Sequence, residues 1–176
     1  TYYDETNSQF KRKLFNIEDL NKINDCVLIV GESGSGKTTL FKQIASNIIY
    51  ENSINNTCEI YPIIVRFVDI RDNNFDLIKT IENYFEKDVF KTLEIEYEEI
   101  LKAKNFVLFV DALDEIGEKE DKDKALIAIK EFQKNNCDIQ IFCSSRNSDS
   151  LLGTCRDLDF RYFEINNISL QQAESF

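Results

Sequence analysis

Short apolar runs alternate along this chain with longer stretches in which apolar residues recur at helical spacing. The runs are rich in β-branched residues and predict buried strands at residues 26–30, 60–68, 106–110, 139–143 and 161–165. The longer stretches predict helices at residues 16–23, 37–50, 75–85, 90–100 and 120–134. Strands that alternate with helices pair in parallel through right-handed crossovers. The pattern therefore predicts an α/β fold, a three-layer α/β/α sandwich with about five mostly parallel strands.

Proline and polar residues refine this arrangement. Pro62 lies near the start of the second predicted strand, and proline cannot donate a hydrogen bond to a neighbouring strand. That strand is therefore expected at an edge of the sheet. Residues 51–58 are polar and predict a turn. The helix before this turn is expected to face the core with Leu40, Phe41, Ile44, Ala45, Ile48 and Ile49.

The loop after the first strand matches the pattern G-x-x-x-x-G-K-[ST] at every position. Its glycines let consecutive backbone N–H groups point inward, and the following helix adds its positive dipole end, so the loop can hold a polyphosphate. Lys37 is expected to contact the β- and γ-phosphates, and Thr38 to ligate Mg²⁺. The cofactors expected are ATP or ADP and Mg²⁺, and the expected nucleotide-binding residues are Gly31, Glu32, Ser33, Gly34, Ser35, Gly36, Lys37, Thr38 and Thr39.

Acidic residues follow the third strand directly. Asp111 comes after five apolar residues, and Asp114 and Glu115 follow within four positions. Open parallel sheets bind ligands at the carboxyl ends of their strands. We therefore expect Asp111 to hold Mg²⁺ and one of the other two acids to polarise an attacking water.

The fourth strand leads into Ser144-Ser145-Arg146 at the same edge of the sheet. A strand that delivers hydroxyls and then an arginine to this edge suits a sensor of the γ-phosphate. Arg146 is the candidate for that role, since its guanidinium can pair with phosphate oxygens.

The stretch from Asp111 to Glu115 resembles the corresponding segment of NACHT-type NTPases in the STAND class of P-loop NTPases. In that family a small residue, here Ala112, follows the magnesium acid, and a pair of acids comes three residues on. Ser144-Ser145-Arg146 is similar to the family's T/S-S-R sensor segment, with Asn147 where a proline is typical. The resemblance rests on three short segments and spans roughly residues 10–176. By this resemblance Asp111 supports Mg²⁺, and Glu115 is favoured over Asp114 for activating water.

The resemblance also implies an organisation and an activity. It implies a strand order of 5-1-4-3-2 and three segments: a lead-in with a short helix (1–25), the NTPase core (26–167), and the start of a truncated helical domain (168–176). The implied activity is slow ATP hydrolysis that serves a nucleotide-gated oligomerisation switch, in prokaryotic antiviral defence or innate-immunity-like signalling. Self-association of the full-length protein, with sensor and effector domains outside this segment, is implied as well.

Composition narrows the alternatives. The chain has 21 Lys+Arg against 32 Asp+Glu and no His, which excludes histidine catalysis and disfavours direct binding to nucleic acid or anionic lipid. No apolar run approaches the ~18–20 residues of a membrane span. Five cysteines without a C-x-x-C pair are expected to be reduced thiols of a cytoplasmic protein. The chain begins at Thr1, and we expect it to be a segment of a longer protein.

Two other classes stay open at this point. An AAA+ ring ATPase shares the phosphate loop, and a small-molecule kinase does too, although no cluster of lid arginines is visible. A GTPase would need an N-K-x-D segment after the fourth strand, and a transporter ATPase would need a Ser-Gly-Gly signature. The chain contains neither.

Overall fold

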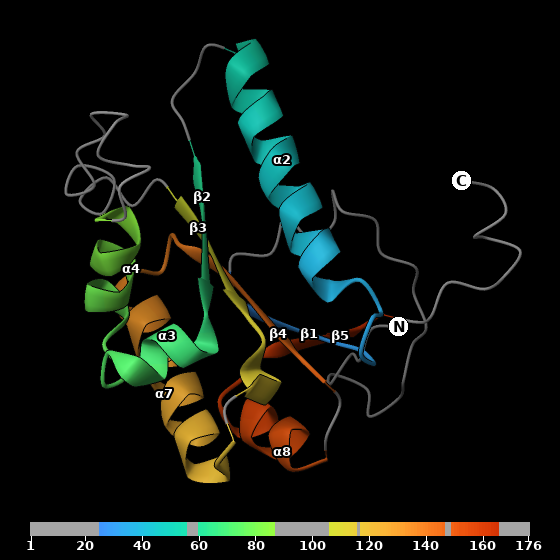
Figure 1. The fold of residues 1–176 in the computed structure, drawn as a ribbon, viewed down its shortest axis with the longest axis vertical. Helices are drawn as coiled ribbons and strands as arrows, with labels where there is room; N and C mark the ends of the chain where they lie inside the picture. Colours follow the sequence, from blue (N-terminus) through green and yellow to red (C-terminus); the bar gives the residue numbers. More distant parts are fainter. Residues whose placement is uncertain (1–24, 56–59, 87–105, 116, 147–148, 166–176) are drawn as a thin grey trace, which may run out of the picture.

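The computed structural model describes residues 25–55, 60–86, 106–115, 117–146 and 149–165. They contain one five-stranded sheet, in which every strand runs parallel to its neighbours (Figure 1). The strands are β1 (Cys26–Val30), β2 (Tyr61–Arg66), β3 (Phe106–Asp111), β4 (Gln140–Ser145) and β5 (Arg161–Glu164). Their order across the sheet is β2-β3-β4-β1-β5, which confirms the predicted order. The strand with Pro62 lies at an edge, as predicted.

Helices cover both faces of this sheet, as Figure 1 shows. They are α2 (Lys37–Asn55), α3 (Phe67–Asp72), α4 (Leu77–Phe85), α7 (Lys119–Asn135) and α8 (Asp149–Asp157), with a 3-10 turn, η2, at Leu113–Glu115. Among the described helices, α2 alone covers one face, and the other four cover the opposite face. The predicted three-layer sandwich is confirmed.

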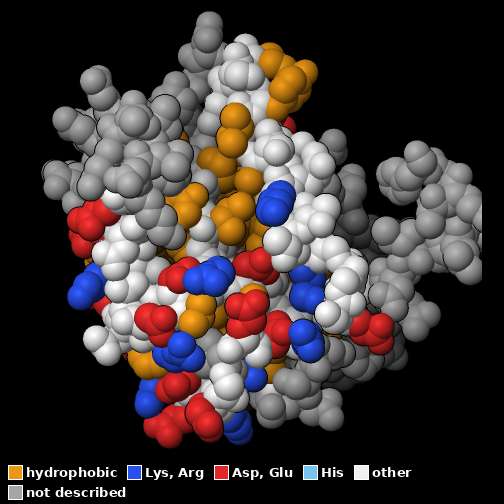
Figure 2. Space-filling model, viewed as in Figure 1, with side chains coloured by type: hydrophobic (Ala, Val, Ile, Leu, Met, Phe, Trp, Pro, Cys, Tyr) orange, Lys and Arg blue, Asp and Glu red, His pale blue; other side chains and the backbone are white. Residues whose placement is uncertain are grey.

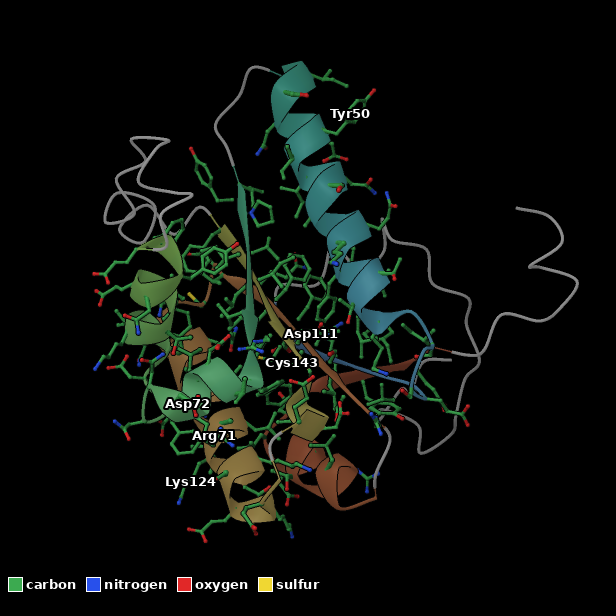
Figure 3. All side chains as sticks on the ribbon, viewed as in Figure 1. Tyr50, Arg71, Asp72, Asp111, Lys124 and Cys143 are labelled. Atoms are coloured by element: carbon green, nitrogen blue, oxygen red, sulfur yellow. The ribbon has the colours of Figure 1, made fainter. Side chains whose placement is uncertain are left out.

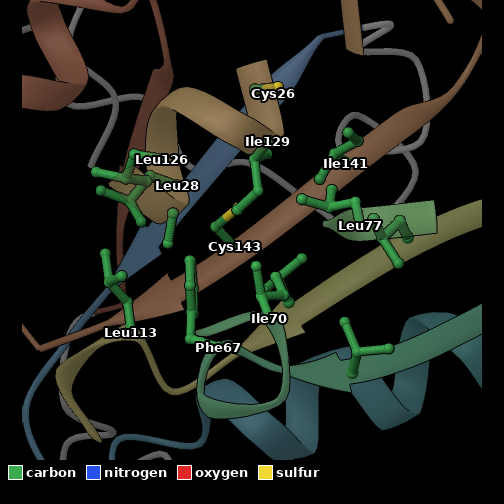
Figure 4. Close-up of a cluster of buried hydrophobic side chains, with 14 of the residues drawn as sticks. Cys26, Leu28, Phe67, Ile70, Leu77, Leu113, Leu126, Ile129, Ile141 and Cys143 are labelled. Carbon is green, nitrogen blue, oxygen red and sulfur yellow. The ribbon is translucent and has the colours of Figure 1, made fainter. Parts of the chain in front are cut away.

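Side chains alternate along the strands between two cores. In β1, Val27 and Ile29 pack under α2, whereas Cys26, Leu28 and Val30 face the other helices. The core under α2 is aromatic at its centre: the Phe109 ring lies 5.2 Å from Phe41 and 5.3 Å from Phe142, between ring centroids. The larger core, part of which is shown in Figure 4, collects aliphatic and aromatic side chains and thiols from β1 to β4 and from the helices α3, α4, α7 and α8. The sheet is therefore packed on both faces.

The helix α2 is longer than predicted. It continues to Asn55 through the polar segment that was expected to turn, and its far end projects beyond the sheet (Figure 1). Because no strand lies beneath that end, Ile49 is 58% exposed, and its expected place in the core is wrong. Figure 2 shows apolar side chains along this part of the molecule and mixed acidic and basic ones around its lower half.

The segment after β2 also differs from the prediction, which continued the strand to Val68. The strand ends at Arg66, and α3 begins at Phe67. The Asp69 carboxylate accepts hydrogen bonds from the Arg66 backbone N–H (3.2 Å) and guanidinium (2.9 Å), which closes the first turn of the helix. Phe67 and Ile70 are then buried on one helix face.

The remaining helices agree with the sequence only in part. The helix expected at 75–85 starts at Leu77, because Asp76 caps it by accepting from the Lys79 N–H (3.0 Å), and Phe75 lies in a left-handed turn with φ 63°. The helix expected at 120–134 is confirmed as α7, and α8 was not predicted. The helices expected at 16–23 and 90–100 lie outside the described residues.

Two further expectations concern the surface and the thiols. No helix in the described ranges is long and apolar enough to cross a membrane. The four described cysteines are free thiols, of which only Cys137 is exposed. Burial raises the pKa of Cys26 and of Cys155 to about 12, so both stay protonated and act as small apolar groups.

Candidate nucleotide-binding site

The glycine-rich loop lies between the end of β1 and the start of α2. Gly34 and Gly36 have φ values of 76° and 92°, a region that residues with a Cβ rarely adopt. At Gly31 the constraint is space, because a Cβ atom would lie 2.5 Å from the Ser35 hydroxyl oxygen. The Gly31 N–H also bonds to the Ser145 carbonyl (3.3 Å), which ties the loop to β4. The backbone curls at Gly34 and Gly36 because glycine readily adopts these positive φ values.

Lys37, the first residue of α2, lies within this loop. Its Nζ donates to the carbonyl oxygens of Gly31 and Glu32, at 2.8 Å each. The ammonium group is therefore held beside the loop backbone, next to the amino end of a 19-residue helix. A positive charge and a helix N-terminus in one place form an anion-binding arrangement.

Thr38 and Asp111 meet across the edge of the sheet. The Thr38 hydroxyl donates to Asp111 Oδ2 at 2.7 Å, although the two residues are 73 positions apart. Figure 3 shows Asp111 at the end of β3, beside the start of α2. A hydroxyl and a carboxylate fit Mg²⁺, which takes oxygen ligands and usually binds through one or two carboxylates, waters and phosphates.

A buried hydroxyl holds the other side of Asp111. Ser144, at 0% exposure, donates to Asp111 Oδ1 and accepts from the Ala112 backbone N–H (2.9 Å). The sequence predicted this hydroxyl at the sheet edge, with Arg146 alone as the candidate sensor. The signal that could have singled it out is a serine at a strand position where all neighbours are buried.

Ala112 explains why a small residue follows the candidate magnesium acid. Its φ is 65°, in the left-handed region, where larger and branched side chains are strained. The chain turns there into η2, and the Glu115 N–H bonds back to the Ala112 carbonyl (3.0 Å). This turn sends Asp114 and Glu115 in different directions.

Asp114 and Arg146 form an ion pair. Arg146 Nε lies 2.8 Å from Asp114 Oδ2, and the Arg146 backbone N–H donates to Oδ1 at 3.3 Å. The exposed Glu115 carboxylate, in contrast, forms no hydrogen bond or ion pair with the residues that the structure describes. Within the described ranges, Asp114 is thus paired with Arg146, whereas the Glu115 carboxylate has no hydrogen-bond or ion-pair partner.

Arg66 is a further cation at this edge that the sequence analysis did not single out. It is the partner of Asp111 in the pairing of β2 with β3. Its guanidinium pairs with Asp69 at 2.9 Å, and this contact raises the pKa of Arg66. Glu115 also raises it, which places that acid within the electrostatic reach of Arg66.

The strand order and the glycine loop between β1 and α2 are those of the P-loop NTPases. All thirteen predicted site residues lie at one end of the sheet, the end at which the parallel strands finish. A comparison with protein-family models identifies the family within this class. The model of the NACHT domain matches residues 25–176, and the chain belongs to that family. The resemblance read from three short segments is confirmed.

Solved structures with a similar fold include proteins of DNA replication. The ORC1 protein of Aeropyrum pernix, solved in complex with DNA, has a TM-score of 0.55 at 12% identity and is matched over 86% of this chain and 42% of its own. Domain III of the Thermotoga maritima replication initiation protein DnaA has a TM-score of 0.51 at 15% identity, over 90% of this chain and 62% of its own. AMPPCP-bound DnaA from Aquifex aeolicus has a TM-score of 0.50 at 16% identity, over 89% and 44%.

At these identities the likeness concerns the fold alone. The chain spans less than two thirds of each of these proteins. No curated protein sequence matches it.

Proposed function

We propose that this NACHT domain binds ATP and ADP together with Mg²⁺ at residues 31–39 and hydrolyses ATP slowly. The observation that carries the proposal is the hydrogen bond from Thr38 to Asp111, which joins the loop to the end of β3. In P-loop sites the Ser or Thr of the loop and an acid from a neighbouring strand hold Mg²⁺ together. A glycine-rich surface turn would need no such partner from another strand.

Each residue of the edge has a distinct part in this proposal. Bound Mg²⁺ would neutralise charge on the β- and γ-phosphates. Lys37, held at the loop by two carbonyls, would donate to the same phosphates. Arg146, at the end of β4, would contact the γ-phosphate. Backbone N–H groups from Gly31 to Thr39 would surround the remaining oxygens.

Glu115 is our candidate for the acid that activates water. A general base needs a free lone pair near the attacking water. Asp114 forms an ion pair with the Arg146 guanidinium and accepts a hydrogen bond from the Arg146 backbone N–H, whereas the Glu115 carboxylate is exposed and pairs with none of the described residues. Asp114 therefore positions Arg146, and Glu115 orients the water.

The hydrolysis we propose serves a switch rather than metabolism. A switch must make different contacts in its two nucleotide states, and Arg146 offers one, because it can pair either with Asp114 or with a γ-phosphate. In a longer protein this change would control self-association and pass to sensor and effector domains. A role in prokaryotic antiviral defence or innate-immunity-like signalling rests on family membership alone. We assign residues 26–167 to the NTPase core, 1–25 to a lead-in and 168–176 to the start of a helical domain.

The ligand in this proposal is a nucleotide and not a nucleic acid. Some proteins of similar fold were solved with DNA, but this chain has a net charge of −11. Contacts to a phosphate backbone need an excess of Lys and Arg on one face, and on the face drawn in Figure 2 basic side chains are interspersed with acidic ones.

Titration calorimetry of ATP with Mg²⁺ tests the proposal. Lys37→Ala removes a charged donor at the loop and should weaken binding by about ten- to hundred-fold. Lys42→Ala is the matched control, because Lys42 is an exposed lysine of the same helix outside the loop. Equal affinities of wild type and Lys37→Ala, or no binding by wild type, would contradict the proposal.

A further inference from the structure

Ser144 is a buried hydroxyl of the site to which the proposed function gives no role. It bridges the Asp111 carboxylate and the Ala112 backbone N–H. We propose that Ser144 is a positioning residue, which fixes the Asp111 carboxylate and so sets the affinity of the site for Mg²⁺. The inference rests on the proposed function, because it takes Mg²⁺ to bind at Thr38 and Asp111.

The direction of these hydrogen bonds follows from the number of protons available. A serine hydroxyl has one proton and two acceptor lone pairs. The Ala112 N–H can only donate, so it occupies a lone pair of Ser144 Oγ, at 2.9 Å. The single Ser144 proton is thereby left for Asp111. The left-handed conformation of Ala112, with φ 65°, keeps its N–H aimed at β4.

Each carboxylate oxygen of Asp111 then accepts one hydrogen bond. Oδ1 accepts from Ser144, and Oδ2 accepts from Thr38. Donors on opposite oxygens restrict rotation of the carboxylate, so its remaining lone pairs keep one orientation. A cation with near-octahedral demands, such as Mg²⁺, depends on that orientation. Without Ser144 the carboxylate could turn and draw the Thr38 hydroxyl away from its ligating position.

The neighbouring serine provides a contrast within the same strand. Ser145 is buried to the same degree, at 2% exposure, but successive side chains of a strand point to opposite faces. Its side chain therefore lies on the other face of β4 from Ser144. If burial of a hydroxyl were all that mattered, the two serines would behave alike.

The test measures ADP binding by calorimetry, with Mg²⁺ and with EDTA, for the full chain and its variants. The readout is the dissociation constant in EDTA divided by the dissociation constant with Mg²⁺, a ratio that isolates the contribution of the metal. Loss of a residue that orients a metal ligand typically costs about 10–100-fold in metal affinity. We expect Ser144→Ala to lower the ratio by about tenfold or more and to leave the affinity in EDTA within about twofold. Ser145→Ala should keep the wild-type ratio.

Two results would overturn the inference. One is a wild-type ratio in Ser144→Ala, and the other is an equal loss of affinity with Mg²⁺ and with EDTA, which indicates general damage. If Ser144→Ala does not fold, Ser144→Cys, a similar shape with a weak donor, must show a reduced ratio, and a wild-type ratio overturns the inference equally. Failure of the proposed function looks different, because the wild-type chain itself would then bind no ADP or show no effect of Mg²⁺.

Discussion

Two ion pairs lie at opposite ends of the parallel sheet. At the carboxyl edge, the Arg146 side chain is 62% exposed and meets Asp114, which is 22% exposed. At the amino edge, before β1, Lys130 of α7 is 8% exposed and meets Asp25, also 22% exposed, at 2.9 Å. The two cations thus differ sharply in burial, although each contacts a carboxylate at nearly the same distance.

The buried pair is part of a closed network. Lys130 Nζ also donates to the Asp159 carbonyl (3.0 Å) and lies 5.6 Å from the centre of the Phe160 ring. Asp25 also accepts from the Cys26 N–H (2.7 Å). The network joins α7, β1 and the turn before β5. Arg161 Nε also lies 3.8 Å from Asp25 Oδ2, but Lys130 is buried, and its charge would lose its carboxylate partner if it moved away from Asp25.

The exposed pair has the opposite property. Surface ion pairs contribute about 0–1 kcal/mol, so Arg146 can leave Asp114 for another anion at little cost. The comparison teaches that this molecule keeps its rigidity at the amino edge and its exchangeable charges at the carboxyl edge. The following predictions test that division, from the largest effect to the smallest.

Glu115→Gln should abolish most hydrolysis without loosening the fold. Removal of a general base lowers a rate by about 10²–10⁴, while the affinity for ATP and the free energy of unfolding should stay near wild type. Single-turnover hydrolysis with radiolabelled ATP measures the rate. Asp114→Asn is the matched control and should stay within about tenfold of wild type; a greater loss there than in Glu115→Gln would assign the water to Asp114 instead.

Lys130→Met should destabilise the fold by about 2–3 kcal/mol, because it leaves the Asp25 carboxylate without its main partner. Urea unfolding measures this change. Adding Asp25→Asn should recover part of the loss, since the orphan charge disappears while an oxygen remains for the Cys26 N–H. Lys134→Met, at an exposed position of the same helix, should change little, and equal losses for both lysines would refute the division.

Arg146→Ala should alter nucleotide preference but hardly change stability. If Arg146 contacts the γ-phosphate, the preference for ATP over ADP should fall about tenfold, while the free energy of unfolding changes by less than about 1 kcal/mol. Competition binding measures the preference. The control Arg71→Ala removes a surface ion pair with Asp72 outside the site and should leave the preference for ATP over ADP unchanged. An unchanged preference for ATP over ADP in Arg146→Ala would contradict the proposal that Arg146 senses the γ-phosphate.

Cys26, beside the buried pair, gives the smallest effect. Its pKa is about 12 in the fold against an ordinary value of 9.0. Above pH 9 the unfolded chain releases this proton while the folded chain keeps it, so stability falls as pH rises towards 12. At pH 10 the loss for one thiol is about 1 kcal/mol. Unfolding curves at pH 8 and pH 10 measure this loss of unfolding free energy. It should be absent in Cys26→Ala and present in Cys137→Ala, the control at an exposed cysteine.

Features that depend on a local pattern were predictable from the sequence. β1 is buried at every residue, so it reads as an unbroken apolar run, and the glycine loop follows it directly. Pro62 placed β2 at an edge, and the resemblance to the family supplied the order of the other strands. β1 and the glycine loop are determined by residues that are close together in the sequence.

Other features depend on contacts between distant segments. α3 was taken for strand because Phe67 and Val68 continue an apolar run, and only the Asp69 contact with Arg66 ends it. The partner of Arg146, Asp114, is 32 positions away in the sequence, and no local pattern around either residue predicts that they pair. The role of Ser144 likewise follows from the juxtaposition of β3 and β4 and from the left-handed Ala112.

A crystal structure of the chain grown with Mg²⁺ and a non-hydrolysable ATP analogue would show where both ligands bind. We expect the β- and γ-phosphates within the loop of residues 31–37, and the cation at about 2.0–2.1 Å from the Thr38 hydroxyl oxygen, on the side of Asp111. Anomalous scattering from Mn²⁺ in place of Mg²⁺ would locate the cation unambiguously. A nucleotide bound elsewhere, or a cation away from both Thr38 and Asp111, would contradict the account.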